Sequence, residues 1–183
     1  LPHPNWFVLA DNIRLFRACG VRGVFAQANN SSVGGELAEL RAWVIAKLLW
    51  NPDRDVAALI GEFLEGYYGR AAPHLAQYLR LVHGAALGLK YYAGSPAIQQ
   101  CLARRGHPPC ARGCYLDLNA VPDAPFLAPD VVLEGLRHFQ AAAAAVQGDP
   151  RRTARIALAR LPLWYVCLLR WDELRRQAAR TGQ

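Results

Sequence analysis

The fold is decided by residues 20–50, which read GVRGVFAQANNSSVGGELAELRAWVIAKLLW. The stretch opens with residues 21–26, whose β-branched and aromatic side chains predict a short buried strand. A polar loop rich in turn-forming residues follows over 27–35. Residues 36–50 then predict a helix that is apolar on almost all sides. A strand, a polar loop and a buried helix in this order form the repeating unit of an α/β barrel, whose loops carry its binding sites.

Helices are expected on both sides of this unit. Residues 9–19 repeat apolar side chains near the helical period, and Gly20 is suited to end that helix. Residues 91–128 are rich in proline and glycine and predict an irregular loop, with a short extended piece near 115–118. Further periodic runs predict helices near 53–69, 71–89, 129–146 and 150–178, the last of them kinked at Pro162.

The expected architecture is therefore mainly α, with one or two short strands. Residues 1–50 are predicted to be the last β/α unit of a (β/α)8 barrel. Residues 51–183 are predicted to be an α-helical C-terminal domain that includes the irregular loop. Asp53 or Asp55 is expected to cap the first helix of that domain.

Composition and charge limit the classes of protein. The chain of 183 residues is 53% hydrophobic, which predicts a globular protein. Its formal net charge is +7, and the densest group of arginines runs from Arg151 to Arg180 at roughly helical spacing. This spacing favours a solvated helix face over a nucleic-acid site. The apolar run 161–169 is far shorter than the ~20 residues that a membrane span needs, so we expect no span.

The chain has five cysteines and no methionine. An odd number cannot pair completely, so we expect free thiols or one local disulfide. Cys101, Cys110, Cys114 and His107 are spaced too loosely for a convincing zinc site, so we predict no metal and no cofactor. Because the chain lacks a first methionine and opens abruptly on LPHPNW, we expect a piece of a longer protein, and its compartment stays open.

The candidate site residues lie around the polar loop. Gln27, Asn29 and Asn30 directly follow the predicted strand, where amide groups can donate to and accept from sugar hydroxyls. Asparagine also serves turn geometry alone. Glu36 is a candidate sugar contact, although an acidic residue at a helix start also complements the helix dipole. Trp6 can stack on a sugar face or belong to the core.

A family resemblance adds to this interpretation. The sequence from 20 to 79 is similar to the domain of unknown function 4838 family, and its most specific element is LLWNPDRDVAALIGEFLEGYYG at 48–69. A weaker similarity covers 155–169, RIALARLPLWYVCLL. Members of this family look like relatives of glycoside hydrolases built on a (β/α)8 barrel, including hexosaminidase-like and α-glucuronidase-like enzymes.

The resemblance implies the C-terminal portion of a carbohydrate-active protein. Its partners would be a glycan and the missing N-terminal part of the same protein, and a secreted or cell-surface location is compatible with it. Glycosidases need two carboxylates flanking the scissile bond. In the related enzymes the principal carboxylates lie on earlier strands, so we expect this chain to form one wall of a sugar site without hydrolase activity of its own.

A non-catalytic helical interaction or scaffold module is the alternative. The family pattern places an acidic residue and a glycine beside the glutamine, whereas this chain has Ala26 and Ala28 on either side of Gln27. These two alanines fit the scaffold alternative slightly better.

Overall fold

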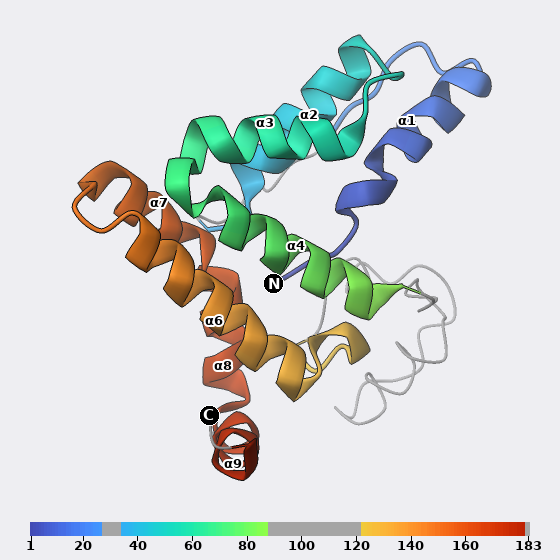
Figure 1. The fold of residues 1–183 in the computed structure, drawn as a ribbon. Helices are drawn as coiled ribbons and strands as arrows, with labels where there is room; N and C mark the ends of the chain where they lie inside the picture. The colour runs from blue at the N-terminus through green and yellow to red at the C-terminus, as the bar shows by residue number, and fades with distance from the viewer. Residues whose placement is uncertain (27–33, 88–121, 182–183) are drawn as a thin grey trace.

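The computed structural model describes residues 1–26, 34–87 and 122–181 of the chain. Most of these residues are helical, which confirms the prediction of a mainly α protein (Figure 1). The elements in chain order are η1 (Trp6–Val8), α1 (Leu9–Ala18), α2 (Ala38–Trp50), α3 (Val56–Tyr68), η2 (Gly69–Ala71), α4 (Ala72–Ala86), η4 (Pro125–Leu127), α6 (Pro129–Ala145), α7 (Pro150–Ala159), α8 (Leu161–Leu169) and α9 (Trp171–Thr181).

Local sequence signals set several helix ends. Helix α1 is followed by Gly20, which has a φ of +75° and turns the chain as a glycine beyond a helix should. Of the two expected caps for α3, the side chain of Asp55 accepts a 2.9 Å hydrogen bond from the backbone N–H of Ala57. Asp149 caps α7 in the same manner, through the backbone N–H of Arg152 at 3.0 Å.

Helix α4 lies at the centre of the arrangement. Figure 1 shows α2 and α3 together on one side of α4 and α6 along its other side, with α7, α8 and α9 following α6. Gly135 of α6 allows close packing here, because a Cβ at this position would lie 3.0 Å from Leu163 Cδ2 and 3.3 Å from Tyr78 Cε2. The close approach of α4, α6 and α8 therefore depends on a missing side chain.

One hydrophobic cluster joins the parts of the chain. It includes Leu40 and Val44 of α2, Leu75 and Leu79 of α4, and Phe139 of α6, all of them fully buried or nearly so. The core thus draws on both sides of the predicted boundary at residue 50. The assignment of residues 1–50 to a separate barrel domain stays a prediction.

The predicted strand at 21–26 is wrong for this chain. These residues are exposed and form neither helix nor strand, with Phe25 89% accessible. A strand satisfies its backbone N–H and C=O groups only by pairing with a neighbour, and no strand occurs among the described residues. The last unit of an α/β barrel is therefore not formed by the described part of the chain.

The predicted long helix at 150–178 is also wrong in detail. The structure has three helices over this range, α7, α8 and α9, which are separated at Arg160 and Arg170. Pro162 lies in the first turn of α8, where a proline needs no hydrogen-bond partner for its nitrogen, so it marks a new helix rather than a kink. The extended piece expected near 115–118 lies outside the described residues.

Candidate functional site

The structure describes two of the five predicted site residues. Gln27, Asn29 and Asn30 lie outside the described residues, so their role as sugar contacts stays a prediction. Trp6 and Glu36 are described, and both are in the protein interior, with 0% and 5% of their surfaces accessible. They belong to one network, because both contact the same arginine, Arg41.

The Glu36 carboxylate is bound on both oxygens. Oε1 accepts a 2.7 Å hydrogen bond from the hydroxyl of Tyr78 on α4, and Oε2 accepts a 2.8 Å bond from the backbone N–H of His3. The guanidinium of Arg41 lies 3.7 Å from Oε2. This one side chain therefore joins the N-terminal segment, the approach to α2 and the middle of α4.

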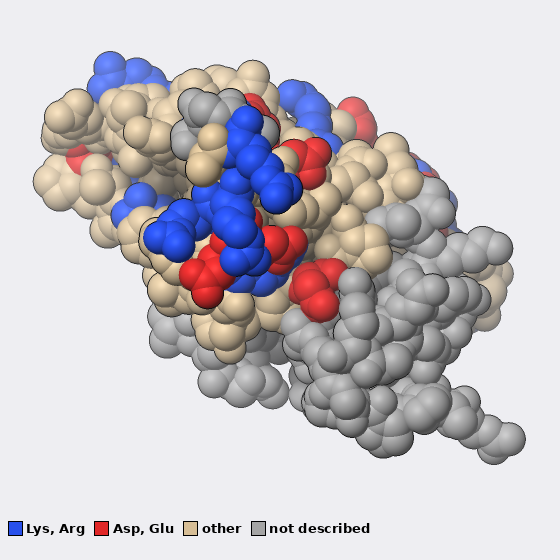
Figure 2. All heavy atoms as spheres, turned by 90° about the horizontal axis from the view of Figure 1, so that it is seen from below, with Lys and Arg blue, Asp and Glu red and all other residues tan. Residues whose placement is uncertain are grey.

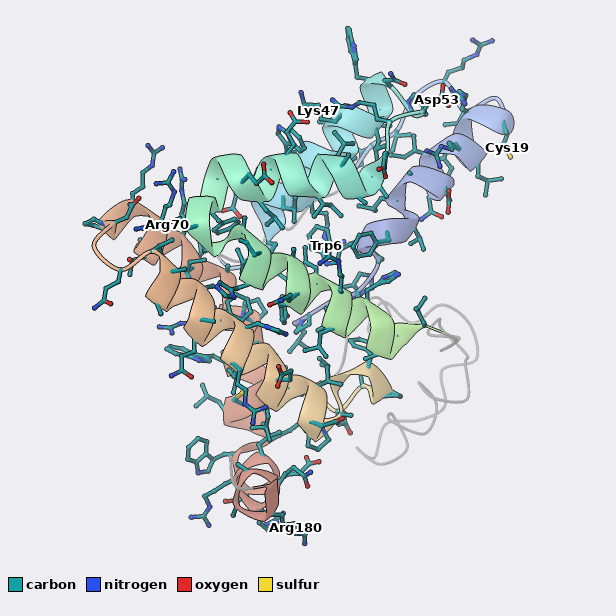
Figure 3. The ribbon with its side chains drawn as sticks, viewed as in Figure 1. Trp6, Cys19, Lys47, Asp53, Arg70 and Arg180 are labelled. Atoms are coloured by element: carbon teal, nitrogen blue, oxygen red, sulfur yellow. The ribbon has the colours of Figure 1, made fainter. Side chains whose placement is uncertain are left out.

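Arg41 connects Glu36 with Trp6. Its guanidinium carbon lies 3.9 Å from the centre of the Trp6 ring, a cation–π contact, and it donates to Asn5 Oδ1 and to the His3 carbonyl. Figure 3 shows Trp6 in the interior of the helical assembly, where η1 meets α4. The faces of the Trp6 ring are thus occupied by the protein itself, which gives this residue a structural role in the core.

Burial changes the proton affinities of the network. Burial and the adjacent Glu36 carboxylate raise the pKa of Tyr78 well above its ordinary value, so its hydroxyl stays protonated and acts as a donor. Burial lowers the pKa of Arg41, and the Glu36 charge opposes that shift. The arrangement is that of a buried ion pair completed by neutral donors.

This network is suited to stabilising the fold more than to catalysing a reaction. Both oxygens of Glu36 are engaged by internal donors, and Glu39 is exposed whereas Glu36 is buried. The pair does not present two carboxylates to one cleft as a glycosidase requires. A sugar contact by Glu36 or Trp6 stays a prediction for a state in which these internal contacts open.

An exposed apolar surface lies where the strand was expected. Val21 and Val24 line a shallow groove of 430 Å³ together with Phe16 of α1 and Leu49 at the end of α2. Phe25 and Trp50 extend the exposed apolar area, with accessible fractions of 89% and 92%. Exposed apolar side chains in this number are typical of surfaces that another molecule or another part of a protein covers.

A second groove was missed by the sequence reasoning. It lies between α2, α3 and the start of α7, has a volume of 430 Å³, and combines aromatic side chains with arginines. No signal in the sequence indicates this groove, because its residues come from three helices and each fits a packing or a surface role within its own helix. The lining residues are Trp43, Glu62, Phe63, Gly66, Tyr67, Asp149, Arg151, Arg152 and Arg155.

The arginines near the C-terminus do not form a uniform positive surface. Figure 2 shows lysine and arginine side chains gathered on the face that carries α9, with acidic side chains among them. On α9, Arg175, Arg176 and Arg180 are exposed, as are Asp172 and Glu173. This mixture of charges is typical of a solvated helix face, and the absence of a nucleic-acid partner stays a prediction.

The described residues offer neither a metal cluster nor a membrane span. The described residues contain no group of three histidine, cysteine or acidic side chains that could hold a metal ion. Cys19 and Cys167 are free thiols, and the residues of the imagined zinc cluster lie outside the described part. Among the helices that the structure describes, none is long and apolar enough to cross a membrane.

Comparison with known proteins identifies a family for the N-terminal part of the chain. Residues 1–80 match a family described as Domain of unknown function (DUF4838). This confirms the family resemblance for the N-terminal part, including the α2–α3 helix pair, while the weaker similarity at 155–169 lies beyond the match. Neither the curated proteins nor the solved structures gave a significant match to the chain.

Proposed function

Residues 1–80 belong to the DUF4838 family, and from this premise we propose that the chain is the helical closing portion of a carbohydrate-active protein. Its own role is to dock against a β-sheet portion of the same protein and to support one wall of a sugar site. The observation that carries the proposal is the exposed apolar segment 21–25 between α1 and α2.

The chemistry of this segment fits a strand without neighbours. Residues 21–26 have the length of an average strand and include Val21, Val24 and Phe25, residue types that favour strands. An added sheet would supply the missing backbone hydrogen bonds and cover the groove formed with Phe16 and Leu49. Segment 21–26 would then become the strand that its sequence favours.

The sugar-binding part of the proposal rests on the residues that follow. When 21–26 pairs with a sheet, Gln27, Asn29 and Asn30 come directly after a strand end, which is where barrel proteins hold their ligands. Their amide groups are suited to sugar hydroxyls. The catalytic carboxylates would come from the docked portion, because Glu36 is engaged by internal donors in this chain.

Hydrogen exchange tests the docking. The coding sequence upstream of Leu1 is read first, and we expect it to encode a β-rich portion. In the full-length protein, the backbone amides of 21–26 should then exchange much more slowly than in the isolated 183-residue chain, because ladder hydrogen bonds protect them. The amides of α4 serve as the control and should be protected in both. An upstream sequence without a β-rich portion, or equal exchange of 21–26, would contradict the proposal.

A non-catalytic scaffold is the second candidate, and the burial of Trp6 and Glu36 in a structural network favours it. Replacement of Gln27, Asn29 and Asn30 by alanine in the full-length protein distinguishes the two. Loss of glycan binding with unchanged thermal stability supports the sugar site. Full retention of glycan binding would show that these three residues do not form the sugar site, and it would support the scaffold role instead.

A further inference from the structure

We propose that the outer face of helix α8 docks on an anionic lipid membrane, with its aromatic and leucine side chains among the lipid headgroups. This α8 face consists of Leu161, Trp164, Tyr165, Leu168 and Leu169. It shares no residue with segment 21–25 or with the apolar groove beside that segment. The inference is therefore independent of the proposed docking to a β-sheet.

Helix α8 has an apolar side chain at every position. Its sequence, LPLWYVCLL, contains no charged or amide residue, and a helix of this kind is normally buried on all sides. One side of α8 is buried as expected, through Pro162, Leu163 and Val166. Leu163 packs against α6, because a Cβ added at Gly135 would lie 3.0 Å from its Cδ2 atom. The fold therefore covers only one side of this helix.

The other side of α8 is exposed as one continuous apolar face. The five residues of the α8 face follow the spacing i, i+3, i+4, i+7 and i+8, which places them on the same side of a helix. Their accessible fractions lie between 41% and 74%. Large side chains exposed to this extent form a patch on the order of 400 Å², and a patch of that size is typical of an interaction surface.

The residue types of the α8 face fit a membrane interface. Trp164 and Tyr165 combine an apolar ring with one polar group, and such side chains gather where lipid headgroups meet water. Trp171, which is 61% accessible, adds a third exposed ring at the start of α9. The leucines supply the apolar part that enters the lipid. Arg160 lies with its guanidinium carbon 3.8 Å from the centre of the Trp164 ring, so a cation stands at the edge of the face.

The distribution of charge favours an anionic surface as the partner. Residues 150–183 contain eight arginines but only two acidic residues, so this segment supplies +6 of the chain's formal charge of +7. One of the two carboxylates, that of Glu173, forms a 2.8 Å ion pair with Arg170. Arg175 and Arg180 of α9 are exposed and form no ion pair within the part of the chain that the structure describes. A surplus of positive charge thus accompanies the apolar face, as in helices that bind anionic membranes.

A second copy of the chain fits the α8 face less well. Two paired faces would bring two segments of charge +6 close together, and like charges oppose such pairing. Two patches on the order of 400 Å² would also bury less than the ~1,200 Å² at which stable protein interfaces begin. A lipid surface is free of both difficulties, because it attracts the arginines and accepts the apolar side chains separately.

Vesicle binding by the 183-residue chain tests the proposal. The probes are phosphatidylcholine vesicles that contain about a quarter phosphatidylserine and vesicles of phosphatidylcholine alone. We expect co-sedimentation with the anionic vesicles, at least about tenfold tighter than with the neutral ones. This affinity should fall about tenfold when NaCl is raised from about 0.05 M to about 0.5 M, because salt screens the arginines. No co-sedimentation with the anionic vesicles, or equal affinity for both kinds, overturns the proposal.

Two matched pairs of variants locate the contact. Leu168→Gln should weaken vesicle binding about tenfold, because this leucine no longer enters the lipid. Leu87→Gln, the same change at a residue that is 70% accessible against 74% for Leu168, should leave it unchanged. Arg160→Gln should weaken binding about fivefold, whereas Arg80→Gln on α4 should not. Unchanged affinity in both Leu168→Gln and Arg160→Gln would place any binding elsewhere and overturn the assignment.

Fluorescence shows which tryptophans enter the lipid. Figure 1 shows α8 and the end of α2, which carries the exposed Trp50, on opposite sides of α4. Brominated phosphatidylcholine in the anionic vesicles should quench the tryptophan emission of the parent chain and of Trp50→Phe. It should quench Trp164→Phe clearly less. Quenching that is lost in Trp50→Phe and kept in Trp164→Phe overturns the proposal.

Two further measurements test the other possible occupants of the α8 face. Sedimentation velocity without vesicles should show a monomer. A dimer that Leu168→Gln converts to a monomer would identify a second copy as the occupant and overturn the proposal. The full-length protein should bind the anionic vesicles as the 183-residue chain does. Failure of the full-length protein to bind them would show that another part of that protein covers the α8 face, which also overturns the proposal.

Discussion

The hydroxyl of Tyr78 donates a 2.7 Å hydrogen bond to the carboxylate of Glu36, which is 42 residues earlier in the chain. Both side chains are buried, and the contact joins the central helix α4 to the segment that leads into α2. The ring of Tyr78 also packs 4.7 Å from that of Phe139 on α6, measured between centroids. Tyr78 thus connects three parts of the fold, namely α4, the segment that leads into α2, and α6.

Removal of the Tyr78 hydroxyl measures how much this hydrogen bond contributes to the free energy of unfolding. Tyr78→Phe keeps the ring in the core but leaves one oxygen of a buried carboxylate without its donor. We expect the free energy of unfolding to fall by about 1–3 kcal/mol, as for a buried group that loses a hydrogen bond to a charge. Urea denaturation provides the value, and an unchanged denaturation midpoint would show that the bond contributes nothing.

Replacement of Glu36 itself should be more harmful. Glu36→Ala leaves the Tyr78 hydroxyl and the His3 N–H without their acceptor and removes the carboxylate that pairs with the Arg41 guanidinium, so we expect a loss of about 3–5 kcal/mol. Glu36→Gln retains an acceptor and should cost less. If Glu36 served only a ligand, both variants would keep the stability of the parent chain, and urea denaturation would show it.

Gly135 should resist substitution although it lies in a helix. Alanine normally stabilises a helix relative to glycine, but here the new methyl group would meet Leu163 at 3.0 Å and the Tyr78 ring at 3.3 Å. The ring cannot move freely, because Glu36 and Phe139 hold it. We expect Gly135→Ala to destabilise the protein by about 1 kcal/mol, since overpacking outweighs propensity. A rise in the melting temperature would contradict this packing.

The helices could be predicted from sequence because their signals are local. The period of apolar residues, the glycine after α1 and the aspartate before α3 all act within a few residues of the element they define. The prediction failed at 21–26, where a strand depends on a neighbouring strand that the described chain does not supply. It also failed at 150–178, where Arg160 and Arg170 separate three helices without a glycine to mark the breaks.

The site was harder to predict than the fold. The sequence singled out Glu36 because it follows a polar loop, but its actual partners are Tyr78, Arg41 and the N–H of His3, which only the tertiary structure brings together. The groove at Trp43 and Arg155 combines residues more than 100 positions apart in the chain. Periodicity within one helix contains no information about which residues of different helices line the same groove.

The isolated chain should not hydrolyse glycosides. A glycosidase needs an acid and a nucleophile or base on either side of the bond, whereas the one buried carboxylate of the described chain is fully engaged. We expect no turnover of aryl-glycosides by the 183-residue chain above the buffer rate. Turnover that persists in the purified chain and disappears in Glu36→Gln would contradict this expectation.

The cap of α7 should make stability depend on pH. The backbone N–H and the guanidinium of Arg152 bind the Asp149 carboxylate and lower its pKa below the ordinary value. A lowered pKa in the folded state means that the unfolded chain binds the proton more readily. The contribution of Asp149 is therefore complete above the unfolded pKa of about 3.9 and is lost as the pH falls through the folded pKa.

Two variants test this dependence through melting temperatures at pH 7 and at pH values below 4. Asp149→Ala should melt lower than the parent at pH 7, and the difference should shrink as the pH falls. Asp149→Asn retains a good capping side chain without the charge, so its deficit at pH 7 should be smaller than that of the alanine variant. A deficit of Asp149→Ala that is the same at both ends of this range would show that the ionised carboxylate does not stabilise α7.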